Sequence, residues 1–143
     1  MHRIERSILV PYSAAQMFEL IAGIEDYPHF LPSCVAARQK VLAPDAVEAT
    51  IEIGLRGLRS RFTTRNRLEP PTSIALELVD GPFKCLTGAW TLKPLGDAGC
   101  RIHLLLRYEF VAGPLGRAIA PVFERLAGSL VDAFEAEARR RHG

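Results

Sequence analysis

A row of arginines in the middle of the chain has a spacing suited to binding phosphate. Arg59, Arg61, Arg65 and Arg67 occupy alternate positions, and Thr63 separates the two pairs. Alternate residues of a β-strand point to the same face, so the four guanidinium groups would share one face of a sheet. A guanidinium binds phosphate oxygens through two hydrogen bonds, which makes RNA or an anionic lipid the candidate partner. A solvated sheet face is the alternative interpretation.

The strand before this row determines how much of its charge is neutralised. With a turn centred on residues 55 and 56, Glu52 would lie opposite Arg59. Thr50 would then lie opposite Arg61. We therefore expect one arginine to be paired across strands and the others to be less so.

The opposite face of the arginine strand combines apolar and polar residues. Phe62, Thr64 and Asn66 alternate with the arginines, so we expect them to face the core. A buried amide without a partner costs about 1–3 kcal/mol. Either the fold provides a partner for Asn66, or its amide points into a cavity that holds water or the head group of a ligand.

The histidines and cysteines have no arrangement typical of a catalytic or metal centre. The four histidines lack H-x-H and H-E-x-x-H spacing, and no G-x-S-x-G motif occurs. Cys34 follows His29 within a proline-bound segment, but this spacing does not establish a nucleophile and base. None of the three cysteines forms a C-x-x-C pair. We expect no catalytic residue, no metal and no required cofactor.

Length and composition indicate one globular domain over residues 1–143. The chain is 48% hydrophobic with a formal net charge of +2, which excludes a disordered protein and does not indicate a DNA-binding one. No apolar run approaches the roughly 18 residues needed to cross a bilayer, and no apolar signal region begins the chain. We expect a cytoplasmic protein, with peripheral contact at the inner membrane left open.

Hydropathy patterns predict the elements that position these residues. In chain order they are a strand at 3–10, a short helix at about 14–22, an irregular aromatic-rich segment at 26–32, six strands between 35 and 110, and a helix at 114–141. Strands joined by short turns form an antiparallel sheet. Its single apolar face and the apolar stripe of the last helix would cover each other. The predicted class is α+β, a curved sheet around a C-terminal helix with an apolar cavity between them.

Three segments resemble motifs of the coenzyme-Q-binding START-like family. Residues 27–34 resemble its Y-P-x-F-L-P-x-C segment, and residues 62–66 resemble its F-T-T-R-N strand. Residues 78–84, followed by Gly88 and Trp90, resemble its L-V-D-G-P-F-K…G-x-W hairpin. The family lies in the polyketide cyclase superfamily, and its bacterial branch is also called the ribosome association toxin RatA. The resemblance implies a helix-grip fold of the START/Bet v 1 type, without a metal and without demonstrated chemistry.

The resemblance implies three alternative functions. Eukaryotic members are associated with ubiquinone binding and respiration, and non-enzymatic binding of ubiquinone or a related polyprenyl quinone is the leading expectation. Some bacterial members are associated with binding the large ribosomal subunit and blocking subunit joining, which is the alternative here. The polyketide aromatase/cyclases of the superfamily suggest, by fold analogy alone, an enzyme.

A quinone site would be formed by the inward face of the sheet and the apolar stripe of the last helix. For each residue the alternative is that its side chain only fills the hydrophobic core. The expected residues are Ile51, Ile53, Phe62, Thr64, Asn66, Leu76, Leu78, Trp90, Leu106, Tyr108, Phe110, Val122, Phe123, Leu126 and Leu130. Thr64, Asn66 and Tyr108 could donate hydrogen bonds to the quinone carbonyls.

Aromatic residues in two proline-containing segments extend this expected site. Tyr27, Phe30 and Leu31 lie beside two prolines, and Phe83 follows a Gly-Pro pair. Such residues could guard the mouth of a pocket, enter a bilayer interface or plug the open end of the sheet. We include Tyr27, Phe30 and Phe83 in the expected ligand-binding set.

Overall fold

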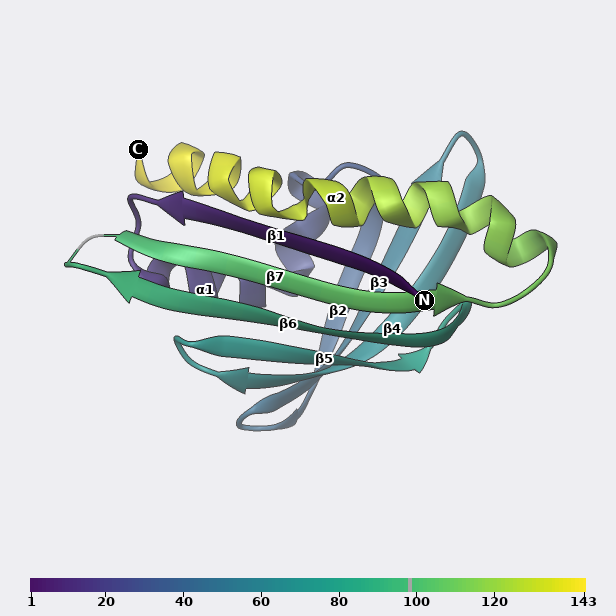
Figure 1. Ribbon diagram of the computed structural model, residues 1–143, viewed down its shortest axis with the longest axis horizontal. Helices are drawn as coiled ribbons and strands as arrows, with labels where there is room; N and C mark the ends of the chain where they lie inside the picture. Colours follow the sequence, from purple (N-terminus) through teal and green to yellow (C-terminus); the bar gives the residue numbers. More distant parts are fainter. Residues whose placement is uncertain (98) are drawn as a thin grey trace.

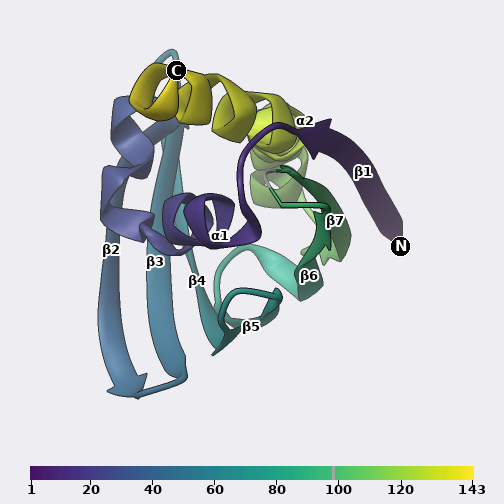
Figure 2. The same ribbon diagram turned by 90° about the vertical axis from the view of Figure 1, so that its left-hand side faces the viewer.

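An antiparallel sheet of seven strands curls around the helices in the computed structural model, which describes residues 1–97 and 99–143. The strand order is β1-β7-β6-β5-β4-β3-β2, and α2 lies along the inside of the curve (Figure 1; Figure 2). The elements are β1 (His2–Val10), α1 (Ala14–Ala22), the 3-10 helix η1 (Ile24–His29), β2 (Cys34–Ala43), β3 (Ala46–Leu55), β4 (Leu58–Glu69), β5 (Ser73–Asp80), β6 (Phe83–Leu95), β7 (Gly99–Phe110) and α2 (Pro114–His142). The predicted helix-grip arrangement is confirmed.

Local sequence signals explain where the helices begin. The Ser13 side chain accepts a hydrogen bond from the Gln16 backbone at 3.1 Å, and the Gln16 side chain accepts one from the Ser13 backbone at 3.0 Å. This reciprocal capping box starts α1. The segment expected to be irregular instead contains η1, because Pro28 supplies a helical φ and a 3-10 helix this short needs few backbone donors.

The helix α2 lies on the sheet through one buried stripe. Ile119, Val122, Phe123, Leu126 and Phe134 are all at most 4% exposed. Ile119, Val122, Phe123 and Leu126 occupy positions i, i+3, i+4 and i+7, which lie on one side of a helix. In the described ranges, no helix is long and apolar enough to cross a membrane.

The hairpin between β3 and β4 has a different register from the expected one. Its turn is formed by Arg56 and Gly57, both with positive φ, 53° and 85°. This two-residue geometry matches the twist of antiparallel strands, and it moves the turn by one position. Glu52 therefore lies opposite Arg61 rather than Arg59. Because the pairing shifts by two residues, every side chain keeps its predicted face.

Candidate functional site

An apolar cavity of about 70 Å³ lies between the sheet, α2 and η1. Eleven residues of the expected ligand-binding set line it. They are Tyr27, Ile51, Phe62, Thr64, Asn66, Leu76, Trp90, Leu106, Phe123, Leu126 and Leu130. The repeats of the strands and of the last helix thus identified most residues of the cavity wall, because the repeat determines which side chains face inward.

Seven residues of the expected set lie outside the cavity wall. They are Phe30, Ile53, Leu78, Phe83, Tyr108, Phe110 and Val122. Several of them form an aromatic cluster towards one end of the sheet, where Phe83 stacks on Phe110 with ring centroids 5.0 Å apart. The Tyr108 hydroxyl donates to the Glu124 carboxylate at 2.8 Å, and Tyr108 does not line the cavity, so the expected contact of Tyr108 with a ligand stays a prediction. Alternation predicts the face of a residue but not its position along a curved strand.

Five wall residues were missed by the sequence interpretation. They are Ile24, Leu31, Ala49, Leu86 and Ala127. Ala49 and Leu86 alternate in the same way as the inward-facing residues of their strands, so the two-residue alternation would have been enough to identify them. Ile24 and Leu31 come from the η1 region, which has no regular apolar period; Leu31 was considered for the mouth of a pocket but not included in the expected set, and only the tertiary structure places Ile24.

Two polar residues of β4 interrupt the apolar wall. The Thr64 hydroxyl donates to the Asn66 side-chain oxygen at 2.7 Å, and both residues are buried. Among the described contacts, nothing accepts a hydrogen bond from the Asn66 amide nitrogen. No side-chain nitrogen or oxygen in the same ranges is both enclosed and unpartnered, so this nitrogen borders open space. Asn66 lines both this cavity and a smaller pocket of about 20 Å³, and it offers one polar donor to an occupant with an acceptor oxygen there.

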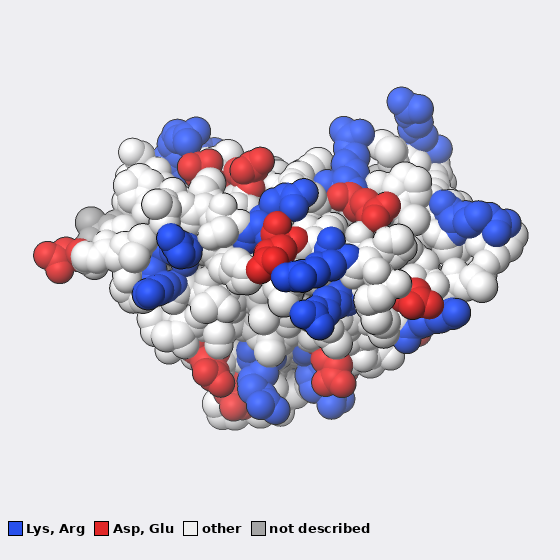
Figure 3. Space-filling view, viewed as in Figure 1, with Lys and Arg blue, Asp and Glu red and all other residues white. Residues whose placement is uncertain are grey.

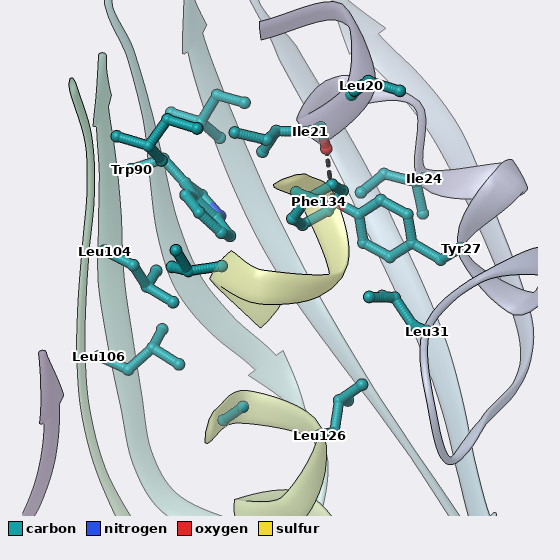
Figure 4. Close-up of a cluster of buried hydrophobic side chains, with 14 of the residues drawn as sticks. Leu20, Ile21, Ile24, Tyr27, Leu31, Trp90, Leu104, Leu106, Leu126 and Phe134 are labelled. Carbon is teal, nitrogen blue, oxygen red and sulfur yellow. Dashed lines mark hydrogen bonds between the residues drawn. The ribbon is translucent and has the colours of Figure 1, made fainter. Parts of the chain in front are cut away.

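The residues around the cavity do not favour nucleophilic chemistry at Cys34. Burial raises the pKa of its thiol to about 11, so the neutral form predominates at neutral pH. Nearby, the Tyr27 hydroxyl donates to the Ile21 carbonyl oxygen (Figure 4), and burial raises the pKa of Tyr27 as well. Both groups therefore act as neutral parts of the packing.

The aromatic residues of the two proline-containing segments pack inside the protein. Tyr27, Leu31 and Phe83 are 4–6% exposed. Phe30 is half-buried, and its ring lies 5.4 Å from that of Phe134. The bilayer interpretation is therefore wrong for Tyr27, Leu31 and Phe83, because the core already covers their apolar surface. Tyr27 and Leu31 instead contribute to the cavity wall.

The arginine row lies on the outer face of β4, as predicted. All four of its arginines are exposed. Arg59 forms an ion pair with Glu52 at 3.0 Å, a diagonal contact in the observed register. Arg61, Arg65 and Arg67 form no ion pair with any of the described residues. The three guanidinium groups are available to an external anion.

The surroundings of the row vary along β4. Arg65 lies between Glu48 on β3 and Glu77 on β5. Arg67 lies between two alanines, at positions 46 and 75. Thr50, expected opposite Arg61, lies opposite Thr63, and their hydroxyls are 2.9 Å apart. Carboxylates also lie near Arg67, because Asp45 and Glu69 line the same surface hollow as Arg65 and Arg67.

Comparison with known proteins assigns the family. Residues 10–135 match the family described as polyketide cyclase / dehydrase and lipid transport. The chain belongs to this family. The Zhui aromatase/cyclase from Streptomyces sp. R1128, a structure of the same fold, superposes with a TM-score of 0.84 at 18% identity, covering 98% of this chain and 94% of that one. This likeness confirms the START-like fold.

Two curated relatives of the chain carry functional names. The ribosome association toxin RatA of Escherichia coli K12 is 41% identical over 139 residues, which are 97% of this chain and 88% of the relative. The mitochondrial coenzyme Q-binding protein COQ10 of Drosophila melanogaster is 26% identical over 139 residues, which are 94% of this chain and 57% of the relative.

Proposed function

We propose that the protein associates with the ribosome through the outer face of β4. The observation that carries this proposal is the set of exposed arginines, Arg61, Arg65 and Arg67, which form no ion pair within the described ranges. The 41% identity to a protein named ribosome association toxin supports it over nearly the whole chain. Ribosome association would place the protein's action in the cytoplasm.

Ribosomal RNA is the partner that suits this surface. Outward positions two residues apart on a strand lie about 7 Å from each other, so the row presents regularly spaced donors to a phosphate backbone. Glu48 and Glu77 beside Arg65 reduce the net charge of the face. Binding would therefore depend on placing phosphates at the guanidinium groups rather than on a broad basic surface.

Charge reversal in the row tests this proposal. The double substitution Arg61→Glu and Arg65→Glu should weaken co-sedimentation with purified large ribosomal subunits at least tenfold. The slope of log affinity against log salt should fall by about 2, one for each lost phosphate contact. Arg117→Glu with Arg125→Glu, an equal charge change at exposed sites on α2, is the matched control. Equal binding by wild type and the β4 variant would refute the proposal.

Binding of an apolar ligand with a carbonyl acceptor is the second candidate function. The open Asn66 amide in an otherwise apolar cavity favours it, and the relative named coenzyme Q-binding protein suggests a quinone. We rank it second because about 70 Å³ is well below the roughly 300–1,000 Å³ of pockets for drug-sized ligands. A quinone would therefore require the wall to open. The cyclase alternative is supported by fold likeness alone.

Asn66→Leu tests the second candidate. Protein purified from quinone-producing cells would be extracted with solvent and its bound quinone quantified. Removing the amide should lower retained quinone about fivefold, the effect of one hydrogen bond of about 1 kcal/mol. Gln39→Leu, at an exposed position on β2, is the control. Unchanged retention in the Asn66 variant would show that this amide does not anchor a quinone.

A further inference from the structure

Two exposed leucines and two basic residues meet at one end of the outer sheet face. Leu9 on β1 is 59% exposed, and Leu95 on β6 is 42% exposed. Arg101 on β7 lies directly between Leu9 and Lys93 on β6. Lys93 and Leu95 are two residues apart on one strand, so they share a face. We call Leu9, Lys93, Leu95 and Arg101 the hairpin-end patch.

The two basic side chains of the hairpin-end patch lie next to each other on neighbouring strands. Lys93 and Arg101 are directly opposite each other, an arrangement that destabilises a sheet. Neither takes part in an ion pair in the part of the chain that the structure describes. On the next rung are Thr91 and His103, and Asp97 follows in the turn. Figure 3 shows basic atoms over this end of β6 and β7 and acidic atoms at the tip of the hairpin.

The position of the patch suits contact with a flat surface. The β6–β7 hairpin projects at the end of the molecule where β1 also ends (Figure 1). The patch is remote in strand order from the arginine row, because β5 separates β4 from β6. Contact at the hairpin end therefore involves a different set of residues from those proposed for the ribosome.

We propose that the hairpin-end patch docks the protein on an anionic lipid bilayer. Lys93 and Arg101 would contact lipid phosphates, and Leu9 and Leu95 would enter the boundary between head groups and acyl chains. A bilayer supplies both an anionic surface and an apolar layer next to it. RNA supplies the phosphates, but its backbone leaves the two leucines in water, so the combination favours lipid.

Vesicle sedimentation tests the charge contribution. Wild-type protein should bind vesicles of phosphatidylglycerol and phosphatidylcholine more strongly than vesicles of phosphatidylcholine alone. Each basic side chain near an anionic surface contributes about fivefold, so Lys93→Gln with Arg101→Gln should weaken binding to the mixed vesicles about 25-fold. Arg117→Gln with Arg125→Gln makes the same charge change at exposed positions on α2 and should alter vesicle binding less than twofold.

A second variant tests the apolar contribution, and a second readout separates this proposal from ribosome association. Leu9→Gln with Leu95→Gln changes only exposed positions, so the fold should persist while vesicle binding falls. The Lys93/Arg101 variant should still co-sediment with ribosomal subunits. Absence of wild-type binding to anionic vesicles, or unchanged binding by the leucine variant, would overturn the proposal. Loss of ribosome binding without loss of vesicle binding would instead identify the patch as an RNA contact.

Discussion

Phe134→Ala should lower the free energy of unfolding by about 3–5 kcal/mol, the range for deleting a buried phenylalanine ring. Phe134 is 0% exposed and lies where α2, β6 and η1 meet (Figure 4). Its ring lies edge-on to Trp90 with centroids 5.4 Å apart, and edge-on to Tyr27 with centroids 5.3 Å apart. The substitution removes transfer free energy and leaves a void that these rigid neighbours cannot fill.

Urea unfolding monitored by circular dichroism measures this effect. Leu115→Ala, at a 54% exposed position on the same helix, should change stability by less than about 0.5 kcal/mol. A loss below about 1 kcal/mol for Phe134→Ala would contradict the packing described here, because the neighbours would then have collapsed into the void. Tyr27 and Trp90 also line the cavity, so the substitution would change the cavity wall as well as the core.

Glu137→Gln should lower the free energy of unfolding by about 2 kcal/mol at neutral pH, the scale of hydrogen bonds to charged groups. The Glu137 side chain is 5% exposed and accepts hydrogen bonds from Arg140 at 2.6 and 2.9 Å. It also accepts one from Arg141 at 2.7 Å. Arg141 in turn lies 3.5 Å from Asp26, so this cluster ties the end of α2 to η1.

The effect of Glu137→Gln should depend on pH in a defined direction. Hydrogen bonds from Arg140, opposed by burial and reinforced by Arg141, lower the pKa of Glu137 from 4.5 to about 2. A carboxylate with a lowered pKa in the folded state stabilises the fold above its unfolded pKa. That contribution is lost as the pH falls from about 5 towards 2.

Urea titrations at several pH values measure this dependence. The stability difference between wild type and Glu137→Gln should be largest near pH 7 and should shrink as the pH falls through the interval below 4.5. Asp132→Gln, at an exposed position on the same helix, should show no comparable trend. A difference that stays constant down to pH 2 would contradict a charged role for Glu137.

The arginine row shows how far periodicity predicts a surface. Alternation along β4 placed all four arginines outward and Thr64 and Asn66 inward, because side chains of a strand have a period of two. The expected pairing with β3 was wrong by two residues. The reason is local. Arg56 adopts a left-handed backbone conformation, which is rare for arginine, and this conformation fixes the position of the turn between β3 and β4.

The cavity shows a different limit. Inward-facing residues were identified by period, but Tyr108 and Phe110 belong to an aromatic cluster and not to the wall. Ile24 and Leu31 reach the wall from a segment without a regular pattern. Position along a curved sheet depends on twist and on the helix that packs against it, and neither is encoded in local periodicity.

The amino-acid sequence by itself determined the element order, the two faces of the sheet and the family motifs, because each of these is written in short-range patterns. Only the tertiary structure decided that Lys93 lies opposite Arg101, that Glu137 binds two arginines, and that the cavity is small. These features arise from contacts between side chains set by strand register and helix packing. Such contacts depend on the geometry of the whole sheet, and the spacing of neighbouring residues does not determine that geometry.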